Sequence, residues 1–222
     1  MPEIRTSHLA VTRTARYAAF GPVPSLADEW WIVLHGYGQL AGDFASQCAA
    51  LDNGRRLVVA PEALSRFYQP GANGSQPDAR VGASWMTRED RESEIADYLG
   101  YLDALVEALG AGVPAEPPIH VLAFSQGTAT ASRWVASGRV NVARFVCWGG
   151  LIAPELDIAS PGAPLRRTRV QMVVGSRDRF ATADRVAAEH ARLDDAKLSY
   201  EAITFEGGHR LDDQTLARLA AN

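Results

Sequence analysis

The segment Ile119-His120-Val121-Leu122-Ala123-Phe124-Ser125-Gln126-Gly127-Thr128-Ala129-Thr130-Ala131 decides the predicted fold. An apolar run ends at Ser125, and a run of small residues that suits a helix follows at once. This pattern predicts a strand that turns sharply at Ser125 and continues as a helix, a nucleophile elbow that raises a serine hydroxyl above the end of a sheet. Such a turn needs small residues two positions either side of the serine, and the sequence has Ala123 and Gly127 there.

The composition is typical of a globular domain with a full core. Of the 222 residues, 47% are hydrophobic and 22% are charged, so we expect a single domain over residues 1–222. The net charge of −4 provides no basic surface for nucleic acid. No apolar run approaches the roughly 20 residues of a membrane span, and the first residues lack the regions of a signal peptide. We therefore expect a cytoplasmic protein without nucleic-acid partners and without an integral membrane segment.

The two cysteines, Cys48 and Cys147, lie far apart in the sequence and in apolar surroundings. Free cysteines in such surroundings behave as small hydrophobic residues, and a cytoplasmic protein keeps its thiols reduced. We interpret both as buried, reduced thiols, with a disulfide or a reactive site as the alternative.

Strands and helices alternate along the chain. Short apolar runs predict buried strands near residues 29–34, 56–60, 118–124, 144–148, 170–174 and 198–205. Helical spacing of apolar residues predicts helices near 44–51, 89–110, 126–136 and 183–195, with a last helix capped by Asp212 or Asp213. Residues 4–20 alternate only loosely and are predicted to form one or two edge strands. This order predicts an α/β fold with a mainly parallel sheet and helices on both faces.

Residues 62–88 show no clear period and contain several prolines and glycines. A loop of this length inside a compact domain is usually functional or disordered. Its aromatic residues favour a wall or lid over a site, and the alternative is a surface excursion packed on the core. Tyr68 and Trp85 in this loop, and Phe180 further along, are candidate walls of a substrate pocket, with plain core packing as the alternative.

Polar residues flanked by glycine follow four of the predicted strands. They are His35, Ser125, Asp178 and His209. Ligands of open parallel sheets bind outside the carboxyl ends of the strands, so we expect these four side chains to converge on one place.

Acyl transfer explains these residue types. A serine hydroxyl is a poor nucleophile until an imidazole takes its proton, and a carboxylate must orient that imidazole. On a sheet with a nucleophile elbow the three groups follow the chain order Ser, Asp or Glu, His, which here gives Ser125, Asp178 and His209. The negative charge on the attacked carbonyl needs donors, for which we predict the backbone N–H groups of Gln126 and Tyr37.

Alternatives to these assignments are weaker. Ser125 as a simple helix cap would need neither its flanking residues nor the partners downstream. The other aspartates considered lie in a loose loop or on a predicted helix: Asp157, Asp184, Asp194 and Asp195. The other histidines lie near the chain start, inside a strand, on a helix and in the proposed oxyanion loop: His8, His120, His190 and His35. We interpret His35 as a structural hydrogen-bonding residue. No metal-ligand spacing includes His35 and His209, so no metal is expected.

Four motifs together resemble the phospholipase/carboxylesterase family of α/β-hydrolases, which includes small bacterial carboxylesterases and the acyl-protein thioesterases. The motifs are Leu34–Gly38, Ala123–Gly127, Gly175–Asp178 and Gly207–His209, and the resemblance runs from about residue 30 to about residue 210. It implies an α/β-hydrolase fold with a minimal cap and hydrolysis of small-molecule carboxylic esters or thioesters, or of lysophospholipids, without a cofactor. It also implies oxyanion donors at Tyr37 and Gln126.

The sequence departs from the family pattern at three points. Ala123 replaces the usual glycine before the serine, which is sterically tolerable. Tyr37-Gly38-Gln39 replaces Leu-Gly-Asp, and Thr128 stands where a second glycine is common. We expect the last two departures to alter the entrance of the pocket.

Two classes of function follow. The first is a serine hydrolase of small or medium acyl esters, with a lactone hydrolase or a cofactor-free perhydrolase as variants of the same chemistry. The second is a non-catalytic α/β-hydrolase scaffold used for binding, and the intact set of Ser125, Asp178 and His209 argues against it.

Overall fold

The computed structural model describes residues 2–69 and 79–221, and its centre is a seven-stranded sheet in the order β1-β3-β2-β6-β7-β8-β9. The strands are β1 (Tyr17–Phe20), β2 (Glu29–Leu34), β3 (Arg56–Pro61), β6 (Ile119–Phe124), β7 (Val142–Trp148), β8 (Arg169–Gly175) and β9 (Tyr200–Phe205). Strand β1 runs antiparallel to β3, and every other neighbouring pair is parallel. The mainly parallel sheet predicted from the sequence is confirmed.

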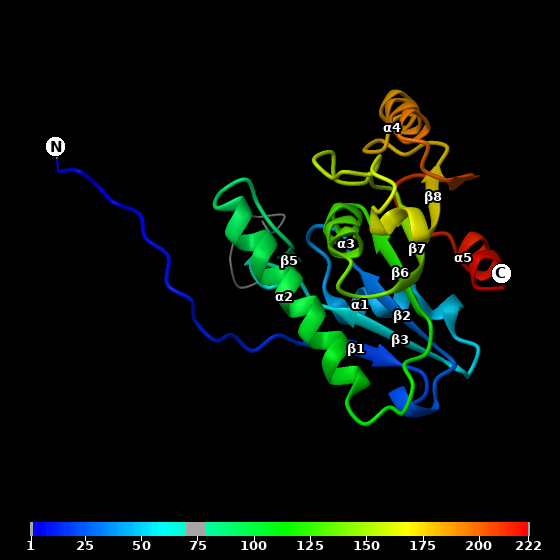
Figure 1. Ribbon diagram of the computed structural model, residues 1–222, viewed down its shortest axis with the longest axis horizontal. Coiled ribbons are helices and arrows are strands. Elements are labelled where there is room, and N and C mark those ends of the chain that lie inside the picture. Colours follow the sequence, from blue (N-terminus) through cyan, green and yellow to red (C-terminus); the bar gives the residue numbers. More distant parts are fainter. Residues whose placement is uncertain (1, 70–78, 222) are drawn as a thin grey trace.

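Helices cover both faces of this sheet (Figure 1). They are α1 (Ala41–Gln47), α2 (Arg91–Gly110), α3 (Gln126–Ser137), α4 (Ala183–Asp195) and α5 (Asp213–Ala221), with short 3₁₀ turns at Pro24–Leu26, Ala49–Leu51 and Pro164–Arg167. Helices α2, α3 and α4 contribute to one hydrophobic core, whereas α1 and α5 contribute to the other.

Strand β2 divides these two cores because successive side chains of a strand point to opposite faces. Trp30, Ile32 and Leu34 pack under α2 and α3. Trp31 and Val33 pack under α1 and α5. A strand that is buried on both faces has an almost unbroken run of apolar residues, which is why β2 could be predicted from the sequence.

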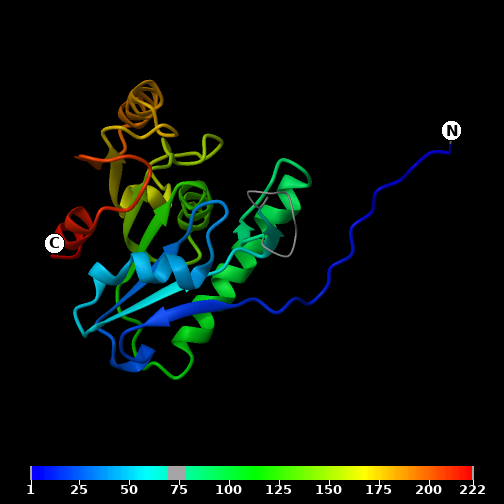
Figure 2. The same cartoon turned by 180° about the vertical axis from the view of Figure 1, so that it is seen from behind.

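The N-terminal prediction is wrong for most of its length. Of residues 4–20, only Tyr17–Phe20 pair with the sheet. Residues 2–16 form no helix or strand and run away from the sheet as an extended arm (Figures 1 and 2). Leu9 and Val11 are 86% and 77% exposed. Their loose alternation has no neighbouring strand to pair with, so the pattern alone does not make a strand.

The long segment 62–88 contains an antiparallel hairpin that its sequence did not predict. Strands β4 (Ser65–Tyr68) and β5 (Val81–Ser84) pair along their whole length. Each has four residues, which is too short for a period of two to stand out against the surrounding polar residues. Residues 70–78, on which part of the predicted lid falls, lie outside the described residues.

Two smaller predictions, the cap of the last helix and the buried thiols, are confirmed. The carboxylate of Asp212 accepts a hydrogen bond from the Thr215 N–H (3.0 Å) at the start of α5, as an N-cap does. Cys48 and Cys147 are buried and free. In the described part of the chain, no helix is both long and apolar enough to cross a membrane.

Candidate active site

Ser125 stands on a sharp turn between β6 and α3. Its backbone has φ 54° and ψ −118°, a conformation that is uncommon for a residue with a side chain and that often marks a functional site. Gly127 is required just beyond it, because a Cβ there would lie 2.6 Å from the Leu34 carbonyl oxygen and 2.7 Å from that of His35. Ala123 is fully buried before the turn. The predicted strand–turn–helix at Ser125 is therefore present.

His209 lies between Ser125 and Asp178. Its Nε2 atom is 2.8 Å from Ser125 Oγ, and its Nδ1 atom is 2.7 Å from Asp178 Oδ2. Because an ionised carboxylate only accepts hydrogen bonds, Nδ1 carries the proton of the neutral ring, and Nε2 is left to accept the serine proton. The structure brings the three predicted residues into one hydrogen-bonded chain.

Asp178 is held in an ionised state by the turn that carries it. Its Oδ1 atom accepts hydrogen bonds from the N–H groups of Phe180 (2.8 Å) and Ala181 (2.9 Å). Burial acts to raise the pKa of Asp178, but these bonds and the bond from His209 outweigh burial, so the pKa lies below its ordinary value.

The loop that carries His209 is fixed by close backbone contacts. The Arg177 N–H donates to the Gly207 carbonyl oxygen (2.8 Å), and a Cβ on Gly175 would lie 2.5 Å from that same oxygen. The imidazole ring itself packs between the rings of Phe124 and Phe180, each with its centroid 4.7 Å away. The ring is thus oriented by packing as well as by Asp178.

The loop after β2 passes directly beside Ser125. A Cβ on Gly36 would lie 3.1 Å from the Ser125 Cβ. The Gly36 N–H donates to Oε1 of Gln39 (2.8 Å), and the Gly38 N–H donates to the Ala83 carbonyl (2.8 Å). These bonds fix the backbone on both sides of Tyr37, the residue predicted to supply an oxyanion donor.

Gln126, the second predicted donor, is the first residue of α3. The first N–H groups of a helix have no partner within the helix, and they lie at the positive end of the helix dipole. An anion beside Ser125 would meet this end of α3 on one side and the loop of Tyr37 on the other.

His35 has a structural position behind the loop, in agreement with its interpretation from the sequence. Its Nδ1 donates to the Gly36 carbonyl (2.7 Å), and its Nε2 accepts the N–H of Ala63 (3.1 Å). Burial lowers the pKa of His35, so the ring is neutral and joins the ends of β2 and β3.

Trp85 is a buried spacer between the two segments predicted to supply oxyanion donors. It is 2% exposed, and its indole N–H donates to the His35 carbonyl (2.9 Å). Its backbone N–H donates to Oε1 of Gln126 (3.1 Å), whose Nε2 donates to the Met86 carbonyl (2.8 Å). This role of the Gln126 side chain could not be predicted from the sequence, because only folding brings residues 40 positions apart into contact.

A second missed residue is Glu62, whose side chain is 1% exposed. Its carboxylate accepts hydrogen bonds from Arg16 (2.6 and 2.9 Å), from Arg66 (2.8 Å) and from the N–H of Ala41 (3.2 Å). Burial acts to raise the pKa of Glu62, but Arg16, the Ala41 N–H and Arg66 hold it below its ordinary value. Glu62 thereby ties the start of α1 to the hairpin. The one sequence signal for such a role is that Glu62 directly follows strand β3.

An open cleft with a volume of about 470 Å³ adjoins the serine. Ser125, Gln126, Leu151 and Phe180 are among the residues that line it. Of the three candidate pocket walls, Phe180 is the one among its described lining residues. Trp85 lies buried behind the loop that follows β2, and Tyr68 is 63% exposed on the hairpin.

The expectation for Thr128 is wrong, because this residue does not lie at the pocket entrance. Its side chain is fully buried, and its Oγ1 donates to the Ala123 carbonyl (3.0 Å) inside the elbow. Tyr37 does lie at the surface, where its ring stacks on that of Phe67 at a centroid distance of 5.0 Å.

The described residues contain no group of three or more His, Cys, Asp or Glu side chains that could surround a metal ion. His35 and His209 belong to separate hydrogen-bond networks.

Comparison with known families gives one match that covers most of the chain. Residues 30–217 match the model of the family described as Serine hydrolase (FSH1). This range includes Ser125, Asp178 and His209. No curated protein sequence matches the chain significantly.

Solved structures with a similar fold include several esterases. Esterase PE8 has a TM-score of 0.66 at 19% identity, over 94% of this chain and 97% of its own. The Bacillus cereus carboxylesterase has a TM-score of 0.68 at 12% identity, over 93% and 92% of the two chains. Acyl-protein thioesterase 2 of Zea mays has a TM-score of 0.68 at 17% identity, over 94% and 99%. At these identities the similarity establishes the fold, and the predicted α/β-hydrolase fold is confirmed.

Proposed function

Because this chain belongs to the FSH1 family of serine hydrolases, we propose that it cleaves small-molecule carboxylic esters or thioesters through an acyl-serine intermediate. Ser125 is the nucleophile, His209 the general base and acid, and Asp178 the carboxylate that orients His209. The backbone N–H groups of Tyr37 and Gln126 are the oxyanion donors. The cytoplasmic location expected from the sequence stays a prediction.

The position of His209 carries this proposal. An imidazole 2.8 Å from a serine hydroxyl and 2.7 Å from a carboxylate is arranged to take the serine proton and to be stabilised once it is charged. The strained backbone of Ser125 adds support, since such conformations persist where the surrounding structure enforces them.

In the acylation step, Ser125 Oγ attacks the ester carbonyl carbon while Nε2 of His209 takes the hydroxyl proton. The carbonyl oxygen becomes an oxyanion between the N–H groups of Tyr37 and Gln126, which stabilise it more strongly than they stabilise the neutral carbonyl. The tetrahedral intermediate then collapses. The bond to the leaving alcohol or thiol breaks, and His209 returns the proton to that group.

In the deacylation step, water attacks the acyl-serine carbonyl and gives a proton to Nε2 of His209. The second tetrahedral intermediate releases the carboxylic acid, and Ser125 recovers its proton from the imidazolium. The same groups therefore serve both steps, and the reaction needs no further reactant besides water.

A fluorophosphonate probe and one pair of variants test this proposal. We expect the probe to label Ser125 in the wild-type protein, and Ser125→Ala to abolish both labelling and p-nitrophenyl acetate hydrolysis. Ser46→Ala, on the exposed face of α1, is the matched control and should retain both. Full hydrolysis by Ser125→Ala would refute the proposal. A wild-type protein that neither reacts with the probe nor hydrolyses the ester would support the non-catalytic binding alternative.

The acyl and leaving groups need a separate measurement. We propose a panel of acyl esters of increasing length, thioesters, lysophospholipids, lactones and, for perhydrolysis, an ester with hydrogen peroxide as the acceptor. The substrate with the highest kcat/KM identifies the preferred class. A lactone or peroxide preference would replace the ester assignment while leaving the roles of Ser125, Asp178 and His209 unchanged.

A further inference from the structure

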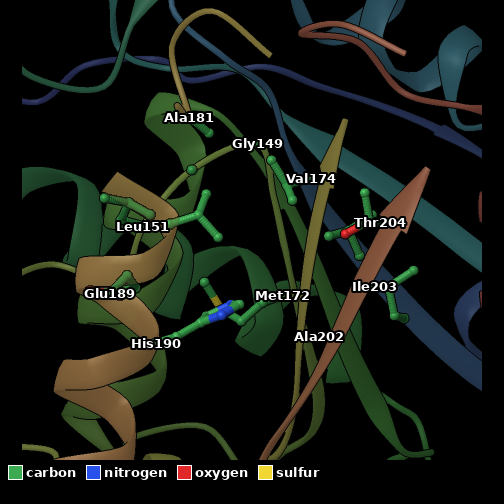
Figure 3. A pocket seen from close by; sticks show the side chains of 13 residues that line it. Gly149, Leu151, Met172, Val174, Ala181, Glu189, His190, Ala202, Ile203 and Thr204 are labelled. Carbon is green, nitrogen blue, oxygen red and sulfur yellow. The ribbon is translucent and has the colours of Figure 1, made fainter. Parts of the chain in front are cut away.

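A second cavity lies beneath α4, on the face of the sheet that also carries α3. Figure 3 shows α4 beside strands β8 and β9. His190 of α4 and Met172 of β8 point into the space between the helix and the strands. The cavity has a volume of about 40 Å³. That volume accommodates about three groups of the size of a water molecule or a methylene.

The sequence of these elements explains why the space exists. Leu193 is fully buried and anchors the C-terminal part of α4 to the core. Nearer the N-terminus of the helix, Val186 faces the sheet, and the opposite wall is formed by the short side chains of Ala202 and Thr204 on β9. Because β9 is the last strand of the sheet, its small residues leave the cavity open toward the sheet edge.

The cavity adjoins the cleft that contains Ser125. Five residues line both spaces: Gly149, Gly150, Leu151, Ala181 and Glu189. This shared wall reaches the catalytic groups, since a Cβ on Gly149 would lie 3.2 Å from the His209 ring and 3.3 Å from Asp178 Oδ2. The shared residues therefore place the cavity immediately beside the cleft at Ser125.

The lining suits an uncharged chain. Leu151, Met172 and Val174 present apolar side chains. The carboxylate of Glu189 is engaged elsewhere, because it accepts the Ile152 N–H (3.0 Å) and two hydrogen bonds from the Arg192 guanidinium (both 2.9 Å). The cavity thus offers mainly apolar surface for burial of alkyl groups, with the His190 imidazole and the Thr204 hydroxyl as polar members of its lining.

The geometry points to the cavity beneath α4 as the acyl-chain pocket, which takes the distal carbons of a medium-length acyl group while its carbonyl lies at Ser125. This inference rests on the proposed function and specifies its substrate class. Each buried methylene contributes about fourfold to binding, so about three methylenes contribute up to roughly sixtyfold.

Two filling variants test the pocket from opposite walls. Ala202→Phe acts from β9 and Val186→Phe from α4, and Ala188→Phe on the exposed face of α4 is the matched control. The readout is the ratio of kcat/KM for p-nitrophenyl octanoate to kcat/KM for p-nitrophenyl acetate. We expect both filling variants to lower this ratio ten- to fiftyfold and the control to retain the wild-type ratio.

The outcomes separate this inference from the proposed function. If the folded filling variants keep the wild-type ratio while Ser125→Ala abolishes acetate hydrolysis, the acyl pocket lies elsewhere and the serine hydrolase assignment stands. If the wild-type protein hydrolyses neither ester, the proposed function itself fails. Circular dichroism shows whether each filling variant folds. If only one of them folds, the substrate ratio of that variant tests the pocket. If neither folds, the test is the crystal structure of wild-type protein labelled with an octyl fluorophosphonate. An octyl chain beneath α4 in that adduct supports the inference, and a chain directed elsewhere overturns it.

Discussion

The side-chain amide of Gln126 holds the backbone of Trp85, whose N–H donates to its Oε1 atom across 3.1 Å. Trp85 in turn donates its indole N–H to the carbonyl of His35 (2.9 Å). One buried residue therefore sets the spacing between the two segments that carry the proposed oxyanion donors. Oxyanion stabilisation depends on donors that are positioned before the reaction, so this spacing should affect turnover.

Gln126→Ala should therefore lower kcat although it keeps the backbone N–H of residue 126. The substitution leaves the Trp85 N–H buried without its acceptor, which costs about 1–3 kcal/mol, and we expect kcat for p-nitrophenyl acetate to fall about tenfold. Gln214→Ala, at an exposed position of α5, is the matched control and should leave kcat unchanged. A wild-type kcat in Gln126→Ala would mean that the Gln126 side chain does not position the donors.

Substitution of the two small residues that flank Ser125 should affect activity very differently. Gly127→Ala places a Cβ 2.6 Å from a backbone oxygen of Leu34, so we expect loss of activity by more than about a hundredfold, or loss of the folded protein. Ala123→Gly removes one buried methyl group from a strand. It should cost about 1 kcal/mol, lower Tm by about 2–4 °C and leave kcat within about twofold. Thermal unfolding and ester hydrolysis measure both variants, and an active, stable Gly127→Ala protein would contradict the elbow geometry.

Glu62 should contribute more to stability than an exposed carboxylate with similar partners. Glu62→Gln leaves Arg16 and Arg66 without their buried carboxylate, and we expect the free energy of unfolding to fall by roughly 2 kcal/mol. The loss stays below that of a fully buried pair because both arginines remain partly hydrated. Glu206→Gln, whose pair with Arg177 is exposed, should show no measurable change in urea unfolding. Equal effects of the two substitutions would show that burial of Glu62 is not what matters.

His120 should make the fold sensitive to acid. Burial lowers its pKa to about 4, while Glu29 acts to raise the pKa and Arg144 and Arg56 act to lower it further. Because the unfolded state binds the proton near the ordinary pKa of about 6.5, the stability contributed by neutral His120 is complete above that pH and is lost as the pH falls toward 4. At pH 4.5 the loss should amount to about 2–3 kcal/mol.

His120→Gln removes this titration and keeps a side chain that can donate to Glu29, which lies 3.2 Å from His120 Nε2. We expect the variant to lose less stability than the wild-type protein between pH 7.5 and pH 4.5, as measured by urea unfolding at each pH. Equal losses of stability in the two proteins would contradict the assignment to His120.

From the sequence one could predict the order of the buried strands and of the helices between them, the elbow and the three residues proposed for catalysis. Apolar runs predicted the buried strands because a parallel sheet covered on both faces excludes polar residues. Ser125, Asp178 and His209 could be predicted together because each follows a strand, and parallel strands bring their carboxyl ends to one edge. These are local patterns combined with one general rule of topology.

Tertiary structure alone decided which polar groups are buried and what they hold. Nothing near Gln126 or Glu62 in the sequence identifies Trp85 or Arg16 as a partner, because only folding brings these residues into contact. The same holds for the exposed arm and the hairpin, whose pairing depends on whether a neighbouring strand is present. The cavity beneath α4 likewise arises from the short residues of β9 facing a helix anchored at Leu193, a packing relationship that no single segment encodes.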